Sequence, residues 1–544
     1  MSAAGATTDM RQAALAWLAQ DPDPDTRAEL ESLLDDPEAL ADRFGAKLEF
    51  GTAGLRGELG AGPNRMNRVT VMRAAAGLAA VLGPGRHVVI GYDARHKSDV
   101  FARDTAAVLT AAGLRASLLP EPLPTPVLAF AVRHLGADAG VTVTASHNPP
   151  RDNGYKVYWG DGSQIVPPVD GRISAAIDAV GPVDGLPLGE GEVLDGAIVE
   201  AYLAAVTELP LGQARDLRVA YTPMHGVGHG TLVSAFRRAG FDEPATVEQQ
   251  RDPDPDFPTV AFPNPEEPGA MDLALALATK VEADLVLAND PDADRCAVGV
   301  PLGGGTFRML TGDEVGALLG EHVITHTRGD RLVATTIVSS TLLGKIAQAH
   351  GVRYAETLTG FKWIMRAGEG LVYGYEEALG YSVGGEHGLP VHDKDGIGAA
   401  LTVAGIAAEA KLTGRTLLDL LDEQARRYGL HATSQLSFRV ADLSLIADAM
   451  ARLRATPPET LGGMAVESWD DLSEGEGGLP PTDGLRYRLG GGARVVVRPS
   501  GTEPKLKCYL EVVVPVTGEV AEARAAAAED LEALKADLRS VMGL

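Results

Sequence analysis

The chain has 544 residues, enough for about three to five domains at roughly 100–200 residues each. A hydrophobic fraction of 45% is typical of a globular protein and excludes a disordered chain. The net charge of −26 comes without a run of lysine or arginine, which argues against a nucleic-acid partner because such proteins carry a basic patch for the phosphates.

The two cysteines, Cys296 and Cys508, form no CxxC pair, so a zinc ribbon and a thioredoxin motif are excluded and a reducing compartment fits. The start of the chain carries Asp9 and Arg11 rather than a basic leader, and no run of 18 apolar residues occurs. We therefore expect a cytoplasmic protein with no membrane partner, present as a monomer or homodimer.

Residues 9–43 are predicted as an N-terminal helical cap (1–43) of two amphipathic segments on either side of the Asp-Pro-Asp-Pro turn at 21–24. After it, strands and helices alternate, beginning with a strand at 87–92, a helix at 99–112 and a strand at 140–144. This rhythm predicts a mostly parallel sheet covered by helices.

The alternation of strands and helices begins again twice further along the chain, and a different pattern follows it. Further strands are predicted at 217–221, 283–288, 331–338, 371–375, 493–497 and 506–514, and helices at 229–239, 397–411 and 518–541. The region 455–490, rich in Pro, Gly and acidic residues, is predicted as linker or long loops. The fold class is therefore α/β: three similar mixed α/β domains in series, 44–205, 206–318 and 319–440, plus a smaller C-terminal α+β domain, 441–544, around a central cleft.

The strand predicted at 140–144 runs into Thr144-Ala-Ser-His-Asn-Pro-Pro150. Ligands of open α/β sheets bind beyond the carboxyl ends of strands, where this loop places Ser146 and His147. A serine is a weak nucleophile unless a base, a metal or prior phosphorylation activates it. The same tripeptide also suits an ordinary turn, so this loop alone leaves both interpretations open.

After the strand predicted at 283–288, Asp290, Asp292 and Asp294 alternate, so three carboxylates can converge in one tight loop. Hard divalent cations prefer such oxygen ligands, and Arg295 beside them could bind a phosphate. An EF-hand is excluded because Arg295 and Pro301 stand where it needs Gly and Glu. Three carboxylates leave room in a Mg²⁺ shell for a phosphate oxygen or water. The alternative is a solvated acidic turn.

Two further loops follow strands in the second half of the chain. Glu376 and Glu377 suit recognition of sugar hydroxyls, although alone the pair is typical of an exposed turn. The loop 498–505 combines a cation, hydroxyls and exposed N–H groups in an anion cradle formed by Arg498, Ser500, Gly501, Thr502 and Lys505. It lacks GxxxxGK[ST], so it is no nucleotide P-loop, and the alternative is a Pro-Gly hairpin turn.

In this order the four loops resemble the phosphoserine, metal-binding, sugar-binding and phosphate-binding loops of the α-D-phosphohexomutase superfamily. The segment 50–57 (FGTAGLRG) resembles the opening motif of that family. Segments 358–364 (LTGFKWI), 375–381 (YEEALGY) and 500–505 (SGTEPK) are similar to the branch with phosphoglucomutases and phosphopentomutases. Ala378 stands where the sugar loop of the family usually has serine, which leaves the identity of the sugar open.

The resemblance implies an intramolecular phosphotransferase. Ser146 would carry a phosphoryl group, pass it to a sugar monophosphate, and take back the other phosphate of the resulting bisphosphate. Mg²⁺ would be bound by Asp290, Asp292, Asp294 and the phosphate on Ser146, and glucose 1,6-bisphosphate would be the intermediate and activator. Catalytic roles are implied for Ser146, His147, Lys156, Arg295 and Lys394, and substrate-binding roles for Arg56, Lys362, Glu376, Glu377, Arg498, Ser500, Gly501, Thr502 and Lys505.

Two physical demands accompany these roles. Lys156 or Lys394 can act as a base only with a lowered pKa, which Arg295 and the metal are expected to provide. Cations gathered at one cleft of an acidic chain would focus an anionic phosphosugar, and the last domain is expected to close over it.

The expected substrates are glucose 1-phosphate and glucose 6-phosphate; a phosphopentomutase acting on ribose or deoxyribose phosphate comes second, a phosphomannomutase third, and bisphosphate synthesis is a minor alternative. A metal-assisted sugar phosphatase could use the same serine, but it needs no second phosphate site. A non-catalytic sugar-phosphate binding protein would have little use for Ser146 and three aspartates.

Overall fold

The computed structural model describes residues 3–51, 54–440, 442, 444–475, 478–500 and 505–542. The chain divides into two compact units. The first consists of Met1–Leu310 and Gly380–Ala408, and the second of Thr311–Leu379 and Glu409–Leu544. Each unit is described by itself.

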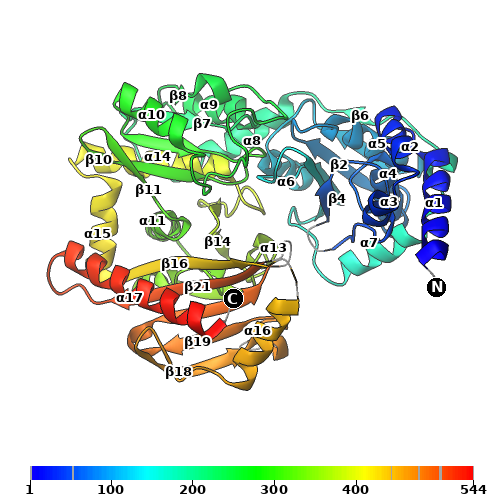
Figure 1. Ribbon diagram of the computed structural model, residues 1–544. Helices are drawn as coiled ribbons and strands as arrows, with labels where there is room; N and C mark the ends of the chain where they lie inside the picture. The colour runs from blue at the N-terminus through cyan, green and yellow to red at the C-terminus, as the bar shows by residue number, and fades with distance from the viewer. Residues whose placement is uncertain are drawn as a thin grey trace. The chain divides into compact units, whose positions relative to one another are not determined.

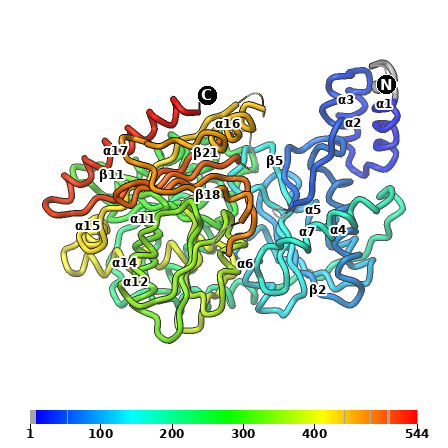
Figure 2. Tube along the Cα trace, turned by 90° about the horizontal axis from the view of Figure 1, so that it is seen from below, coloured from blue at the N-terminus to red at the C-terminus, as the bar shows by residue number. Residues whose placement is uncertain are grey.

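The first unit begins with three helices, α1 (Ala3–Gln20), α2 (Pro24–Leu33) and α3 (Pro37–Phe44), which lie together at the N-terminal end of the chain (Figure 2). The expectation of two helical segments is wrong, because a second Asp-Pro pair, at 36–37, starts a third helix in addition to the one that starts at 23–24. Asp23 and Asp36 each cap a helix with the side chain, and a proline follows in the first turn.

The next part of the unit is a six-stranded mixed sheet. Its order is β1 (Leu55–Glu58), β5 (Asp152–Trp159), β4 (Ala139–Val143), β2 (His87–Tyr92), β3 (Arg115–Leu118) and β6 (Glu192–Val193). Strands β2, β3, β4 and β6 are parallel, whereas β5 runs antiparallel to β4 and to β1. The apolar run of β2 is buried from its second residue on, as expected for a strand covered on both faces.

Helices cover this sheet, as Figure 1 shows for α4 and α5. Those of this part are α4 (Arg68–Leu82), α5 (Ser98–Ala111), α6 (Thr125–His134), α7 (Val169–Asp178) and α8 (Ala197–Thr207). Because β2 and β4 are parallel neighbours, the loops that follow them emerge at the same edge of the sheet. That edge carries the loop of Ser146.

A second sheet completes the strands of residues 206–310, in the order β11 (Thr306–Met309), β10 (Ala297–Gly303), β9 (Leu285–Ala288), β7 (Val219–Thr222) and β8 (Ala245–Thr246). Helices α9 (Gly228–Arg238) and α10 (Asp272–Val281) accompany it. The returning segment adds β15 (Gly380–Val383) and most of α14 (Gly396–Leu412) to the first unit.

The second unit contains the parallel strands β13 (Arg353–Thr357), β12 (Leu332–Thr336) and β14 (Leu371–Glu376), in that order. Its helices before the C-terminal sheet are α11 (Gly312–His326), α12 (Leu342–Ala349), α13 (Phe361–Ile364) and α15 (Leu417–Tyr428). A capping box of Thr311 and Glu314 fixes the start of α11.

The C-terminal part is an antiparallel sheet, β16 (Leu430–Arg439), β21 (Lys505–Val514), β20 (Arg494–Pro499), β19 (Leu485–Leu489), β18 (Met464–Asp471) and β17 (Thr460–Leu461). Helices α16 (Ser444–Ala455) and α17 (Val520–Met542) accompany it, and α17 runs along β21 (Figure 2). The expectation that 455–490 is linker or loop is wrong, because β17, β18 and β19 lie there.

The fold prediction of three α/β domains followed by a smaller α+β domain is confirmed. Among the described residues no single helix has the length and apolarity needed to cross a membrane; α14 and α15 meet that criterion only when taken together as a bent pair.

Candidate active site

Ser146 follows β4 in the left-handed backbone region, with φ 53°. Its N–H donates to Thr144 Oγ1 at 2.8 Å, and its Oγ donates to Asp290 Oδ2 at 2.7 Å. The same Oγ lies 3.3 Å from His147 Nδ1. The structure thus brings the predicted serine loop and the predicted acidic loop together.

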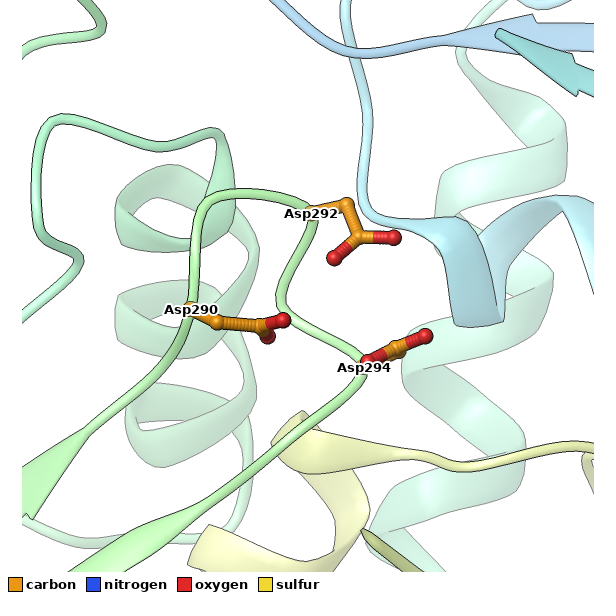
Figure 3. Close-up of side chains that lie close together, drawn as sticks. All are labelled: Asp290, Asp292 and Asp294. Carbon is orange, nitrogen blue, oxygen red and sulfur yellow. The ribbon is translucent and has the colours of Figure 1, made fainter. Parts of the chain in front are cut away.

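The three aspartates project from a single loop between β9 and β10 (Figure 3). Asp290, Asp292 and Asp294 are all buried, and each contributes a carboxylate oxygen to a group within 4.8 Å of one another. Asp292 Oδ1 and Asp294 Oδ1 are buried and accept no hydrogen bond within the described part of the chain. Buried carboxylate oxygens without donors fit a divalent cation as their missing partner.

Two glycines allow neighbouring backbone segments to pack closely against this acidic loop. A Cβ on Gly226 would overlap the backbone of Pro291, and a Cβ on Gly396 would overlap the carbonyl oxygens of Ala293 and Arg295. The loop can therefore sit close to both neighbouring segments only because neither position carries a side chain.

Cationic side chains surround the carboxylates. Lys156 Nζ, from β5, lies 2.9 Å from Asp292 Oδ2 and 3.3 Å from Asp294 Oδ2. Lys394 Nζ lies 3.3 Å from Asp294 Oδ2 as well. Arg295 Nε lies 3.8 Å from Asp294 Oδ1. The three predicted cations therefore share one buried acidic group.

The charges of this group shift one another. Burial, followed by Asp292 and Asp294, holds the pKa of Asp290 well above its usual range. Burial opposes ionisation of Asp292 too, but Lys156 outweighs it and the pKa of Asp292 is lowered. Burial favours a lower pKa for Lys156, yet Asp292 and Asp294 outweigh it, so the pKa of Lys156 is raised. The lowered pKa expected for Lys156 depends on a bound metal as well as on Arg295 and stays a prediction.

Two further predicted residues lie at the serine loop. Arg56, on β1, donates from Nη1 to Asn148 Oδ1 at 3.3 Å. His147 Nδ1 lies 4.0 Å from Asp290 Oδ2. Burial and the neighbouring arginines hold the pKa of His147 well below its usual range, so the imidazole is neutral at neutral pH. His147 therefore offers a hydrogen bond rather than a positive charge.

The structure adds residues that the sequence did not single out. Thr125, at the start of α6, donates from its N–H to Asp292 O at 2.9 Å and from Oγ1 to Asp292 Oδ2 at 2.8 Å. Asp393 Oδ2 accepts from Tyr158 OH and Gln164 Nε2, both at 2.8 Å. The Pro-Thr-Pro segment at the start of α6 and the two aspartates on either side of Lys394 were the available signals.

In the second unit, Glu376 ends β14 and Glu377 follows it. Glu377 Oε2 accepts from Ser339 Oγ at 3.1 Å, and burial, followed by Glu376, raises the pKa of Glu377 to about 7. Lys362 lies on the short helix α13.

The predicted phosphate-binding residues lie around the turn between β20 and β21. Arg498 is on β20 and Lys505 starts β21, and Ser500 N donates to Lys505 O at 2.8 Å. Gly501 and Thr502 lie outside the described residues. In the same unit, burial raises the pKa of Tyr509 on β21; the charge of Glu377 raises this pKa further, and the charge of Arg498 lowers it. The sugar loop and the phosphate turn therefore both lie close enough to Tyr509 to interact electrostatically with it.

Three α/β domains, a C-terminal domain, and a serine hydrogen-bonded to a buried acidic triad define a phosphosugar mutase. Family profiles of phosphoglucomutase/phosphomannomutase match the whole succession: α/β/α domain I over residues 47–183, domain II over 200–303, domain III over 311–428 and the C-terminal domain over 437–536. The chain belongs to the phosphoglucomutase/phosphomannomutase family.

Known relatives carry several mutase names. A Haemophilus influenzae protein named "Probable phosphomannomutase" is 45% identical, over 82% of this chain and 93% of its own length. The human phosphopentomutase is 34% identical (94% and 93%), and the human glucose 1,6-bisphosphate synthase 35% (91% and 89%). A solved Thermus thermophilus structure described as a phosphomannomutase superposes with a TM-score of 0.68 at 28% identity, covering 88% of this chain and 99% of its own.

Proposed function

We propose that this chain interconverts α-D-glucose 1-phosphate and glucose 6-phosphate through a phosphorylated Ser146 and a bisphosphorylated sugar. The observation that carries the proposal is the hydrogen bond of 2.7 Å from Ser146 Oγ to Asp290, within a buried group of three carboxylates and three cations. A simple binding protein would gain nothing from burying so many charges around one hydroxyl.

The chemistry is an exchange of P–O bonds. The bond from phosphorus to Ser146 Oγ breaks as a bond to the sugar hydroxyl oxygen forms, and the second half of the cycle reverses this with the other phosphate. Asp290, Asp292 and Asp294, with an oxygen of the phosphate on Ser146, would hold Mg²⁺. When bound, Mg²⁺ neutralises charge on the transferred phosphoryl group.

A proton must leave the attacking hydroxyl and return to Ser146 or to the sugar in the following step. Lys156 and Lys394 are the proposed acceptors, each as the neutral amine, which becomes an ammonium group on taking the proton and returns it in the next step; both Nζ atoms lie 3.3 Å from Asp294 Oδ2. Arg295 contributes a fixed positive charge at the acidic loop, and His147 a neutral hydrogen-bonding ring beside Ser146.

The residues of the second unit are proposed to bind the rest of the substrate. Glu376, Glu377 and Lys362 would contact the sugar. The phosphate that is not being transferred would be bound by Arg498, Ser500, Gly501, Thr502 and Lys505. Support comes from the chemistry of the turn, where a guanidinium and an ammonium flank hydroxyl groups suited to a phosphate.

Phosphopentomutase activity is the second candidate, because relatives of 34–36% identity across more than nine-tenths of the chain are named phosphopentomutase or phosphoribomutase. The 45% identical relative favours mannose phosphate as a third substrate. A panel of glucose, mannose, ribose and deoxyribose 1-phosphates, ranked by kcat/KM, tests this order. A pentose phosphate ranked first by more than about tenfold would replace glucose in the proposal.

The bisphosphate has support in the relative named glucose 1,6-bisphosphate synthase. Glucose 1,6-bisphosphate should therefore activate the enzyme and phosphorylate Ser146, which intact-mass analysis measures directly. Release of inorganic phosphate at the rate of glucose 1-phosphate loss would instead make the protein a phosphatase. We further propose a cytoplasmic monomer or homodimer, in keeping with two buried, unpaired cysteines.

A further inference from the structure

The loop of Ser146 is built around a single buried guanidinium. Arg95 follows β2, whose loop emerges beside that of β4, and its side chain is 1% exposed. From Nη2 it donates to Ser146 O and Asn148 O, both at 2.6 Å. From Nη1 it donates to Pro149 O at 2.8 Å and Asp152 O at 3.1 Å.

All four N–H groups on Nη1 and Nη2 of Arg95 are thus used by carbonyl oxygens. Its Nε lies 3.4 Å from Asp93 Oδ2, close enough for an ion pair but without the geometry of a hydrogen bond. Asp93 Oδ1 in turn accepts from Arg95 N at 3.0 Å and from Ser98 Oγ at 2.6 Å. The plane of Arg95 lies over the Phe257 ring, 4.9 Å from its centroid. Arg95 therefore cannot bind a phosphate without releasing the loop.

The conformation that Arg95 holds is a strained one. Ser146 adopts φ 53°, a left-handed conformation that costs a non-glycine residue roughly 1–2 kcal/mol. Its N–H is fixed by Thr144 Oγ1 and its C=O by Arg95, so both sides of the residue are held. That conformation is the one in which Oγ reaches Asp290.

We propose that Arg95 is a positioning residue for phosphoryl transfer: its four hydrogen bonds to carbonyl groups hold Ser146 in the left-handed conformation that directs Oγ toward the acidic loop. The proposal rests on the proposed function of Ser146 as phosphoryl carrier. Misplacing a reacting group by about 1 Å can cost about 10²-fold in rate. Loss of Arg95 should therefore lower kcat much more than it changes KM.

The test uses the full-length Arg95→Ala variant, assayed with and without guanidinium at concentrations well below those that unfold the protein. We expect kcat to fall by about 10²-fold or more with KM changed by less than about threefold. Guanidinium should restore kcat by at least about tenfold because it can occupy the vacated cavity and donate to the same carbonyls, whereas ammonium and urea should not. A loss of kcat that guanidinium does not relieve would overturn the proposal.

Arg215→Ala is the matched control. Arg215 also lies over a phenylalanine ring, 4.7 Å from the centroid of Phe241, and donates to backbone carbonyls, including Ala239 O and Ala214 O, both at 2.7 Å. Its hydrogen bonds in the described part of the chain go to carbonyl groups outside the serine and acidic loops, so its loss should lower stability and leave kcat unchanged. Equal losses of kcat in Arg95→Ala and Arg215→Ala would show that Arg95 contributes only to folding, and would refute the positioning role.

Two measurements keep the result interpretable. If Arg95→Ala does not fold, Arg95→Lys preserves charge and most of the volume but cannot donate to four carbonyls; a wild-type kcat in that variant would refute positioning. Amide exchange over residues 144–152 should rise in either variant. Incubation with glucose 1,6-bisphosphate distinguishes failure of the proposed function from failure of the proposed role of Arg95. If the wild-type protein gains no phosphate, the function of Ser146 is refuted. If an Arg95 variant is phosphorylated and has a normal kcat, only the positioning role is refuted.

Discussion

Ser146 Oγ and Asp290 Oδ2 share a hydrogen bond of 2.7 Å that joins the loop after β4 to the loop after β9. Loops from two different sheets thus meet at the hydroxyl on which the proposed reaction depends. The nucleophile and the acidic loop are aligned before any substrate arrives.

Ser146→Ala should abolish turnover, with kcat/KM lowered by about 10⁴-fold or more, because no other hydroxyl replaces the phosphoryl carrier. Alanine removes one oxygen and leaves the fold intact. Phosphate incorporation measured by intact mass should disappear together with activity. Ser32→Ala, at an exposed hydroxyl on α2, is the control and should behave as wild type. Retained turnover in Ser146→Ala would remove the nucleophile from the mechanism.

Asp292→Asn should weaken divalent-cation binding by about 10²-fold or more, because a ligand loses its charge while its neighbours remain. Mn²⁺ binding followed by electron paramagnetic resonance measures this independently of activity. Asp252→Asn is the control, since Asp252 is an exposed carboxylate paired with Arg251. Equal Mn²⁺ affinity in wild type and Asp292→Asn would contradict the metal site.

Arg498→Met should raise KM for glucose 1-phosphate by about 10- to 100-fold, because a charge-assisted hydrogen bond to a phosphate contributes about 1.5–3 kcal/mol. The unfolding midpoint should move little, since Arg498 lies at the end of β20 and is partly exposed. Arg488→Met is the control: Arg488 lies on the neighbouring strand β19, and its guanidinium is paired with Asp470 of β18. An unchanged KM in Arg498→Met would exclude the phosphate role.

Asp313 gives the second unit a pH dependence of known sign. Burial raises its pKa to about 6 despite the hydrogen bond from Ser340 N–H. A raised carboxyl pKa favours the folded state at low pH, so this contribution is complete below about pH 4 and is lost as pH rises through 6, a difference of about 3 kcal/mol. Asp313→Asn should therefore flatten the fall in unfolding free energy between pH 4.5 and 7, measured by urea titration.

Other carboxylates also contribute to the pH dependence of the unfolding free energy, so the comparison of wild type with Asp313→Asn needs a control at a surface carboxylate. Asp242→Asn, at an exposed position, should leave the wild-type slope unchanged. If Asp313→Asn kept that slope as well, the buried carboxyl would not be protonated in the folded protein at pH 4.5.

Gly312→Ala should displace the sugar loop. A Cβ on Gly312 would overlap Glu377 O, which is backbone and cannot swing away. We expect a loss of about 1–3 kcal/mol in stability and a raised KM, because overpacking shifts the backbone next to Glu376 and Glu377. Gly171→Ala, on α7 with open space around it, should instead stabilise by about 0.5–1 kcal/mol. Similar effects of the two substitutions would show that the contact at Gly312 is not tight.

The sequence predicted correctly the position of a strand in which nearly every residue is buried. The apolar run at 87–92 appears as β2 at the predicted residues, because a strand covered on both faces needs apolar residues throughout. Strand β18 was missed because half of its residues are exposed and its polar residues resemble loop sequence. The exposure of β18 does not explain why β19 was missed, since β19 is mostly buried. Strand β5, which carries Lys156, also escaped, although its residues are almost all buried.

The site was predictable where residue type alone implies chemistry. Three alternating aspartates after a strand predicted the acidic cluster, which the structure contains. Arg95 was not predictable, because its partners are carbonyl groups that every residue possesses and only the packed backbone shows four of them converging. The direction of the Lys156 pKa likewise depends on two distances, 2.9 and 3.3 Å, that no spacing in the chain reveals.

The close packing of Gly226 and Gly396 against the acidic loop has a consequence for ion choice. Close packing on two backbone segments opposes widening of the loop, so moving its carboxylates apart for a larger ion would cost packing contacts. Mg²⁺ and Ca²⁺ differ chiefly in radius and in the number of oxygens they require. Discrimination between them would thus depend on two glycines outside the coordination shell as well as on the aspartates.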